Sequence, residues 1–232
     1  MECKKFEFPY RKFYIVIDKV SETDFFLEKM KQFSGFDDFK FYFSAFVSAA
    51  RSITFCIQSV MSKYPNFDKW YPNRQQKLKD SKLCRFFVDI RNHSQKVGDI
   101  PIFQMGKFKN STLDHIAYFI PSLDFPEVPN DDIVSISQKY FCEILFIVFE
   151  LYRDYSAYVD PRAIFSLNGL SRLNWTIEDL EEALGFPRGW TDVSFEGADE
   201  SEQRLAALRR EGGDEEMEHY FIKYNIGKGK NE

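Results

Sequence analysis

The chain has few of the residues and motifs that mark well-known catalytic centres. Its 232 residues include four cysteines and three histidines, and no CxxC pair or Cys/His spacing groups them. The sequence therefore predicts no metal site and no cofactor. It contains no P-loop, no dinucleotide-binding glycine motif, no HExxH and no nucleophile-elbow serine. These absences argue against the common nucleotide hydrolases, dinucleotide-dependent enzymes, zinc proteases and serine hydrolases.

Long uninterrupted hydrophobic runs are also missing. The longest apolar stretch, near Phe141–Leu151, contains Glu143 and Glu150 and is too short to span a bilayer. The first residues mix charged and aromatic side chains and lack the apolar core of a signal peptide. Three of the cysteines fall in apolar helical patterns, where free thiols are usual. We therefore expect a cytoplasmic protein with no contact to a membrane.

Neither sign of charge dominates the chain. A net charge of -5 gives no general argument for binding nucleic acid. Acidic side chains outnumber basic ones after Pro161, so the preceding part is close to neutral. A polyanionic ligand is therefore expected to bind the first part of the chain.

Phenylalanine is abundant, with 26 residues, which predicts a core of large flat side chains. Apolar residues at helical spacing predict helices over residues 23–33, 37–64 and 82–97, and another from a capping Asp131 to about Tyr158. Residues 101–122 suit strands, with a hairpin around Lys109-Asn110-Ser111. The sequence thus predicts a mainly α fold, an antiparallel helical bundle with a short β or irregular insertion at about 99–129.

The composition changes after Asp160, so we divide the chain into a helical bundle over residues 1–160 and an acidic C-terminal appendage over residues 161–232. In the appendage we expect helices over residues 176–184 and 199–211 and a strand over residues 219–226. These segments have too few apolar residues to predict a second core. We expect the appendage to dock on the bundle or to be partly mobile.

Arg91 is the first candidate for a functional residue. Leu83, Phe87 and Arg91 are spaced four apart and share one face of a helix. A guanidinium keeps its charge and is costly to bury without a partner. It should therefore meet an anionic or oxygen-rich group from the fold, a second subunit or a ligand. The structural alternative is an internal salt bridge, or a long stem that reaches water.

Arg51 is the second candidate, because it lies in an apolar helix. The structural interpretation is a salt bridge to Asp89, Glu143 or Glu150. The functional interpretation places Arg51 beside Arg91 in one groove, where the two guanidinium groups clamp a phosphate.

Two helical segments resemble the HEPN superfamily. They are Phe43–Ser52, rich in Ser and Ala, and Phe86–Asn92, which ends in the Arg-Asn pair. The resemblance covers residues 36–160 and implies an all-helical fold that is often dimeric. Many HEPN proteins are ribonucleases that need no metal. In their motif, an Arg and a following polar residue precede a His by roughly four to six intervening residues, and two copies meet across a dimer.

The resemblance gives Arg91 the task of holding a scissile phosphate, with Asn92 as the polar residue that follows it. The motif's His would move a proton. The positions at which it is expected hold Lys96, Val97 and Gly98. Lys96 suits phosphate binding better than proton transfer. His93 is the nearest imidazole, but it points to nearly the opposite side of the helix, so catalysis would require local unwinding or a second subunit.

We therefore expect an HEPN-like homodimer that binds RNA or a nucleotide through an Arg-centred groove, with catalysis weak or lost. Arg91, Asn92 and His93 are the catalytic candidates, and Arg51 and Lys96 are the phosphate-binding candidates. Three alternatives stay open: an active endoribonuclease of a toxin–antitoxin or phage-defence system, a non-catalytic interaction module, and a plain helical protein that only mimics the motif. A cognate protein is the further partner considered.

Overall fold

The computed structural model describes residues 9–32, 35–98, 100–109, 112–192, 199–212 and 216–227. This part of the chain is mainly helical, with one two-stranded sheet. It forms two compact units. The bundle unit is Ile15–Ile147, and the tail unit is Met1–Tyr14 together with Val148–Glu232. The division falls inside a helix and not at residue 160, where the composition changes.

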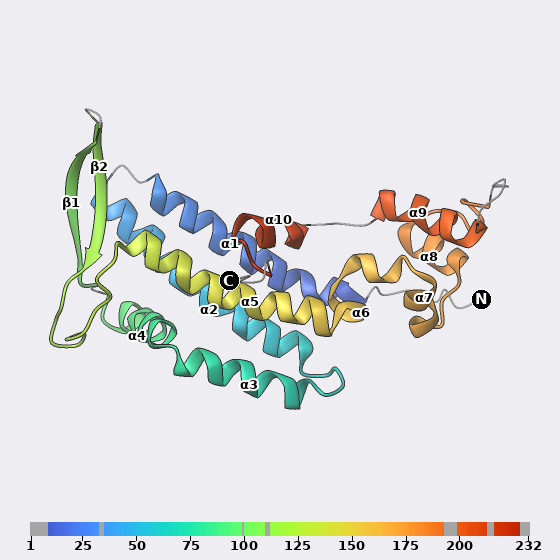
Figure 1. The fold of residues 1–232 in the computed structure, drawn as a ribbon, viewed down its shortest axis with the longest axis horizontal. Coiled ribbons are helices and arrows are strands. Elements are labelled where there is room, and N and C mark those ends of the chain that lie inside the picture. Colours follow the sequence, from blue (N-terminus) through green and yellow to red (C-terminus); the bar gives the residue numbers. More distant parts are fainter. Residues whose placement is uncertain are drawn as a thin grey trace, which may run out of the picture. The chain divides into compact units, whose positions relative to one another are not determined.

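The bundle unit contains long helices, of which the one over residues 67–80 was not predicted (Figure 1). They are α1 (Tyr14–Lys31), α2 (Phe36–Met61), α3 (Phe67–Asp80), α4 (Lys82–Lys96) and the first part of α5 (Ile133–Asp154). The helices predicted over residues 37–64 and 82–97 are confirmed, whereas α1 begins well before the predicted residue 23. Asp131 is not the cap of α5. The backbone N–H of Ser135 donates instead to Oδ1 of Asp132, over 2.9 Å.

Aromatic side chains fill the core of the bundle unit, as the abundance of phenylalanine predicted. Phe87 of α4 stacks on Tyr140 of α5 with ring centroids 4.3 Å apart and an interplanar angle of 9°. Phe46 of α2 packs edge-on against both rings, at 6.3 and 6.4 Å. Three helices are thus held together by contacts among flat rings, which add to the free energy from buried area.

The insertion contains the predicted strands, β1 (Ile102–Lys109) and β2 (Thr112–Phe119), paired antiparallel. Phe119 pairs with Ile102, and both are buried. The Phe119 ring lies 5.5 Å from Phe43 of α2, so this face of the hairpin packs on the bundle. The predicted turn at 109–111 lies partly outside the described residues.

Helix α2 is long and apolar enough, by length and composition, to cross a membrane. Its buried residues include Phe39, Phe43, Phe46, Ile53 and Ile57. The helix thus passes that test with side chains that form the core of the bundle unit.

The tail unit consists of short elements. They are η1 (Pro9–Phe13), the end of α5, α6 (Ser156–Val159), η2 (Pro161–Ile164), α7 (Leu167–Leu173), α8 (Ile177–Leu184), α9 (Glu200–Gly212) and α10 (Glu216–Lys223). The predicted helix over 176–184 is confirmed, and Thr176 and Asp179 form its capping box. The predicted strand over 219–226 is wrong, because Met217, Tyr220 and Tyr224 are buried at helical spacing.

The tail unit also has a core of its own, contrary to expectation. The buried cluster consists of Ile164, Phe165, Leu170, Ile177, Leu180, Leu205 and Leu208. These residues are spread over several short elements, so no single segment is apolar enough to reveal the core. Gly169 allows the close packing there, because a Cβ at this position would lie 2.0 Å from the carbonyl oxygen of Ala163.

Candidate functional site

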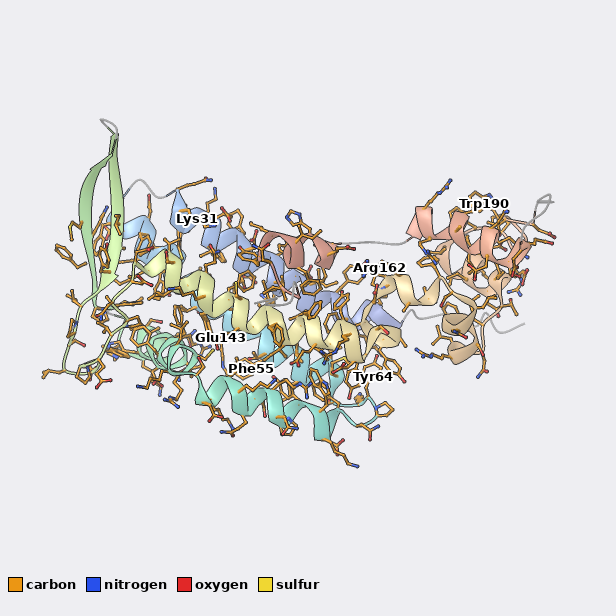
Figure 2. The ribbon with its side chains drawn as sticks, in the orientation of Figure 1. Lys31, Phe55, Tyr64, Glu143, Arg162 and Trp190 are labelled. Atoms are coloured by element: carbon orange, nitrogen blue, oxygen red, sulfur yellow. The ribbon has the colours of Figure 1, made fainter. Side chains whose placement is uncertain are left out.

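A cavity of about 270 Å³ lies in the bundle unit, walled by residues of α2, α3, α4 and α5. Its floor consists of buried side chains: Thr54, Tyr71, Cys84, Tyr140 and Ile144. Its rim consists of exposed side chains: Phe55, Gln58, Lys79, Arg85 and Asp89. Figure 2 labels Phe55 on the side of the bundle that α3 covers. Arg51 is half-buried between floor and rim. The floor thus combines aromatic and aliphatic surface with a few polar groups, and charged side chains lie at the rim, as in many small-molecule sites.

Helix periodicity explains why Arg51 reaches this cavity. Residues three and four apart share a helix face, so Arg51, Thr54, Phe55 and Gln58 project together from α2. This face is adjacent to the α2 stripe that carries Phe46 and Ile53 into the core. The Arg51 side chain therefore starts at the edge of the core and extends along the cavity wall.

Arg51 is held in place without a carboxylate. Its Nη1 donates to Oγ1 of Thr54 over 3.0 Å, and its Cζ lies 4.4 Å from the centroid of the Phe55 ring. No acidic side chain in the described part of the chain forms an ion pair with it. A cation–π contact favours a guanidinium but does not neutralise its charge. Arg51 therefore presents an uncompensated positive charge at the cavity.

The predicted salt bridge from Arg51 to Asp89, Glu143 or Glu150 is wrong. Asp89 lies on the cavity rim without an ion-pair partner among the described residues. Glu143, labelled in Figure 2, accepts hydrogen bonds from Oγ of Ser81 and Sγ of Cys84, each over 3.1 Å. In the tail unit, Glu150 lies 3.7 Å from Arg153.

Cys84 forms part of the cavity floor. Burial, together with the hydrogen bond to the Glu143 carboxylate, raises the pKa of the Cys84 thiol to about 12. The thiol therefore stays protonated at neutral pH, which makes it a poor nucleophile. Within the described residues, no group of three His, Cys, Asp or Glu side chains is placed to hold a metal ion.

Tyr140 contributes a hydroxyl group to the floor. Its side chain is 3 % exposed, and its ring is fixed by the stack on Phe87. No hydrogen bond joins its hydroxyl to any residue that the structure describes. Burial, reinforced by the nearby Cys84, raises the pKa of Tyr140 despite the opposing charges of Arg51 and Arg91. The group is therefore a neutral O–H that can both donate and accept.

Arg91 lies near the cavity without lining it. Its Nη1 donates to Oδ1 of Asn92 over 3.2 Å, and its Nε is buried with no hydrogen-bond partner in the described chain. The Ser94 hydroxyl donates to its backbone carbonyl over 2.8 Å. Arg91 and Arg51 both act electrostatically on the Tyr140 hydroxyl. Arg91 is thus half-buried, as its helical position predicted, and no described carboxylate pairs with it.

His93 and Lys96 lie elsewhere. The His93 ring packs edge-on against Phe125, with centroids 5.2 Å apart. Lys96 is exposed at the end of α4. His93 is therefore not among the residues that line the cavity, and its ring packs on Phe125 while the Arg91 guanidinium donates to Asn92.

Sequence reasoning missed Tyr140 as a site residue. Its apolar helical spacing identified it correctly as a core residue, and nothing in the pattern shows that its hydroxyl opens on a cavity. Asp89 was expected as a partner of Arg51, whereas it is a separate rim group.

Comparisons with known proteins cover this region in part. The protein family described as Bacteriophage lambda protein ea47 matches residues 22–115, which include α2, α3 and α4. Protein ea47 of Escherichia phage lambda is 28% identical over 102 residues, which are 44% of this chain and 24% of that protein. The chain thus spans about a quarter of the relative's length. No solved structure shows significant similarity to the chain. The matched range spans the positions of Arg51, Arg91, Asn92, His93 and Lys96 and ends before Tyr140.

Proposed function

We propose that this protein is an HEPN-like homodimer that binds RNA or a nucleotide through the cavity at Arg51, with little or no catalytic activity. The observation that carries the proposal is the half-buried guanidinium of Arg51, which lines a cavity and has no carboxylate partner in the described chain. Such a charge binds phosphate strongly, because Arg cannot lose its proton and offers several donors in one plane.

The charges at the rim of the cavity favour an anionic ligand. Lys79 and Arg85 line it with Asp89, so the rim and wall together carry three positive charges and one negative. Arg85 is held by a hydrogen bond from its Nη1 to the Lys79 carbonyl, over 2.8 Å. Convergent basic groups raise the local concentration of polyanions and steer their approach.

Arg91 and Asn92 are the residues that we expect to lie near a second protomer. The Arg91 side chain is half-buried and has no carboxylate partner in the described chain, so its guanidinium can take up an anionic group from a second subunit or a ligand. Lys96, exposed at the end of the same helix, adds a charge for the RNA backbone.

Binding is favoured over cleavage by the position of the titratable groups. His93 packs against Phe125, and no imidazole lines the cavity among the described residues. Because Cys84 and Tyr140 stay protonated, neither supplies a base at neutral pH. The phage origin of protein ea47 supports a setting in phage–host conflict for this proposal.

The test is RNA binding by the full chain, measured by fluorescence anisotropy of a labelled single-stranded RNA. Arg51→Ala should weaken binding by about tenfold or more, the size expected for hydrogen bonds to a charged group. Arg172→Ala removes the same charge from an exposed position in the tail unit and should change binding little. Wild-type protein that binds neither RNA nor a nucleotide would refute the proposal.

Two further measurements separate the alternatives. Light scattering of wild type and Arg91→Ala reports whether a dimer forms and whether Arg91 contributes to it. Incubation with total RNA in the presence of EDTA reports metal-independent cleavage. If the wild type cleaves RNA and Arg91→Ala does not, the protein is an endoribonuclease and the proposal of a binding protein without catalytic activity is wrong.

A further inference from the structure

Building on the proposed function, we infer that the cavity receives a single unpaired nucleotide of RNA. Its base lies over the floor and hydrogen-bonds with the Tyr140 hydroxyl, and its phosphate is bound by Arg51. The ligand class is thus single-stranded RNA or a nucleoside monophosphate, and double-stranded RNA is excluded.

The dimensions and walls of the cavity favour one nucleotide. About 270 Å³ is close to the lower limit of small-ligand pockets and is too small for a base pair. The cavity is lined in part by buried side chains, so a base must leave its stack to contact them. RNA-binding proteins commonly recognise bases that are unstacked in this way.

Tyr140 provides the polar group that such a base needs. The other polar groups of the floor are already satisfied within the protein. The Tyr71 hydroxyl donates to the Thr54 carbonyl over 2.9 Å, and the Cys84 thiol donates to Glu143 over 3.1 Å. The Tyr140 hydroxyl has no such partner in the described chain, although its side chain is 97 % buried. This hydroxyl is also not among the fully buried polar atoms that lack a partner, so it is open to the cavity and can donate to or accept from a ligand.

Arg51 and Phe55 form the platform beside this group. The Cζ of Arg51 lies over the Phe55 ring, 4.4 Å from its centroid, so the guanidinium and the ring form a cation–π pair at the cavity. Bases stack on aromatic rings and on guanidinium planes with little dependence on sequence. Only Nη1 of Arg51 is engaged, with Thr54, so its other nitrogens remain to bind a phosphate.

Asp89 limits the site to one phosphate. It is the carboxylate among the residues that line the cavity, and it lies on the rim with Arg85. A second phosphate at this edge would be repelled by the carboxylate, whereas ribose hydroxyls can donate to it. The rim thus favours the sugar of the same nucleotide over the phosphate of the next one.

The experiment compares ligands that share a phosphate and differ in the base. Isothermal titration calorimetry of the full-length protein would measure the dissociation constants of AMP, CMP, GMP, UMP, ribose 5-phosphate and inorganic phosphate. Tyr140→Phe removes one oxygen and keeps the ring stack on Phe87, so the protein should fold normally. We expect it to bind the nucleotides roughly 3- to 10-fold more weakly and ribose 5-phosphate unchanged. Tyr42→Phe, on α2 and outside the cavity, should alter neither affinity.

The outcomes distinguish this inference from the proposed function. If Tyr140→Phe binds nucleotides as wild type does, or weakens ribose 5-phosphate equally, the placement of the base is wrong. The same conclusion follows if a duplex binds as tightly as a single strand. In these cases RNA binding that depends on Arg51 still stands. If wild type binds neither RNA nor nucleotides, both proposals fail.

Discussion

The Cys84 thiol donates a hydrogen bond to Oε2 of Glu143 over 3.1 Å, joining α4 to α5 beside the cavity. The other carboxylate oxygen accepts from the Ser81 hydroxyl, also over 3.1 Å. Both oxygens of Glu143 are thus engaged by neutral donors. This arrangement explains why Glu143 does not pair with Arg51, and it leaves the arginine charge available to an external anion.

The Cys84–Glu143 contact predicts a pH dependence of stability. Burial and the carboxylate raise the pKa of Cys84 from 9.0 to about 12. Because the thiolate is disfavoured in the folded state, its contribution to stability is complete below pH 9 and is lost as the pH rises toward 12. Urea unfolding of wild type and Cys84→Ala, measured over roughly pH 8 to 10.5, should show a steeper decline for wild type.

Other buried groups, including Tyr71 and Cys142, also have raised pKa values and contribute to the same decline. The informative quantity is therefore the difference in slope between the two proteins. Equal slopes would show that the Cys84 thiol ionises as easily in the folded state as in the unfolded chain.

The sequence predicted the bundle well because its signals are local and repeated. Phe43, Phe46, Ile53 and Ile57 recur at helical spacing along α2, and all are buried. In α10 the signal is short, and Tyr220, Ile222, Tyr224 and Ile226 stand at alternate positions, as in a strand. The segment is a helix, and Met217, Tyr220 and Tyr224 are buried on one side of it. Which residues are buried depends on tertiary packing, which the local sequence does not contain.

The site was predicted less completely. Arg51 and Arg91 were identifiable because a charge within an apolar stripe is unusual for a helix. Whether a neighbouring carboxylate neutralises it depends on side-chain positions across three helices, which periodicity does not contain. Tyr140 shows the same limit: its position in the core follows from the pattern, whereas the open side of its hydroxyl follows from packing.

The Phe87–Tyr140 stack predicts a large effect of truncating Phe87. This side chain is 1 % exposed and contacts rings from α2, α4 and α5. Phe87→Ala removes these contacts and leaves a void, which should lower the free energy of unfolding by about 3–5 kcal/mol. Denaturant titration followed by circular dichroism measures the change.

Phe103→Ala is the matched control, because the Phe103 side chain on the hairpin is 51 % exposed. It should lower stability far less. Similar losses for the two variants would mean that the ring cluster does not organise the core of the bundle unit.

In the tail unit, Arg204 and Glu181 form a buried ion pair. We predict that removing the arginine destabilises this unit locally. Nη2 of Arg204 lies 3.2 Å from Oε1 of Glu181, whose side chain is 0 % exposed. Although burial alone would raise the pKa of Glu181, hydrogen bonds from Thr191, Gly189 and Arg204 hold it below its ordinary value. Arg204→Ala leaves the buried carboxylate without its cation, which typically costs about 3–5 kcal/mol.

The pH dependence gives this prediction a distinct signature. A carboxyl group with a lowered pKa stabilises the folded state above its ordinary pKa, and that stabilisation is lost as the pH falls. Without Arg204 the pKa of Glu181 rises, so acid-induced exposure of the tail unit should begin at higher pH. Limited proteolysis over residues 161–227, resolved by mass spectrometry across an acid pH series, would detect it.

Arg188→Ala provides the control for Arg204→Ala, because it also removes an arginine that contacts helix α8. Arg188 donates to Asp179 and Glu182 over 2.7 and 2.9 Å, but its side chain is 51 % exposed. Water replaces an exposed partner readily, so this variant should change the proteolysis pattern little. If both variants open the tail unit at the same pH, the effect comes from loss of surface charge and not from the unpaired Glu181 carboxylate.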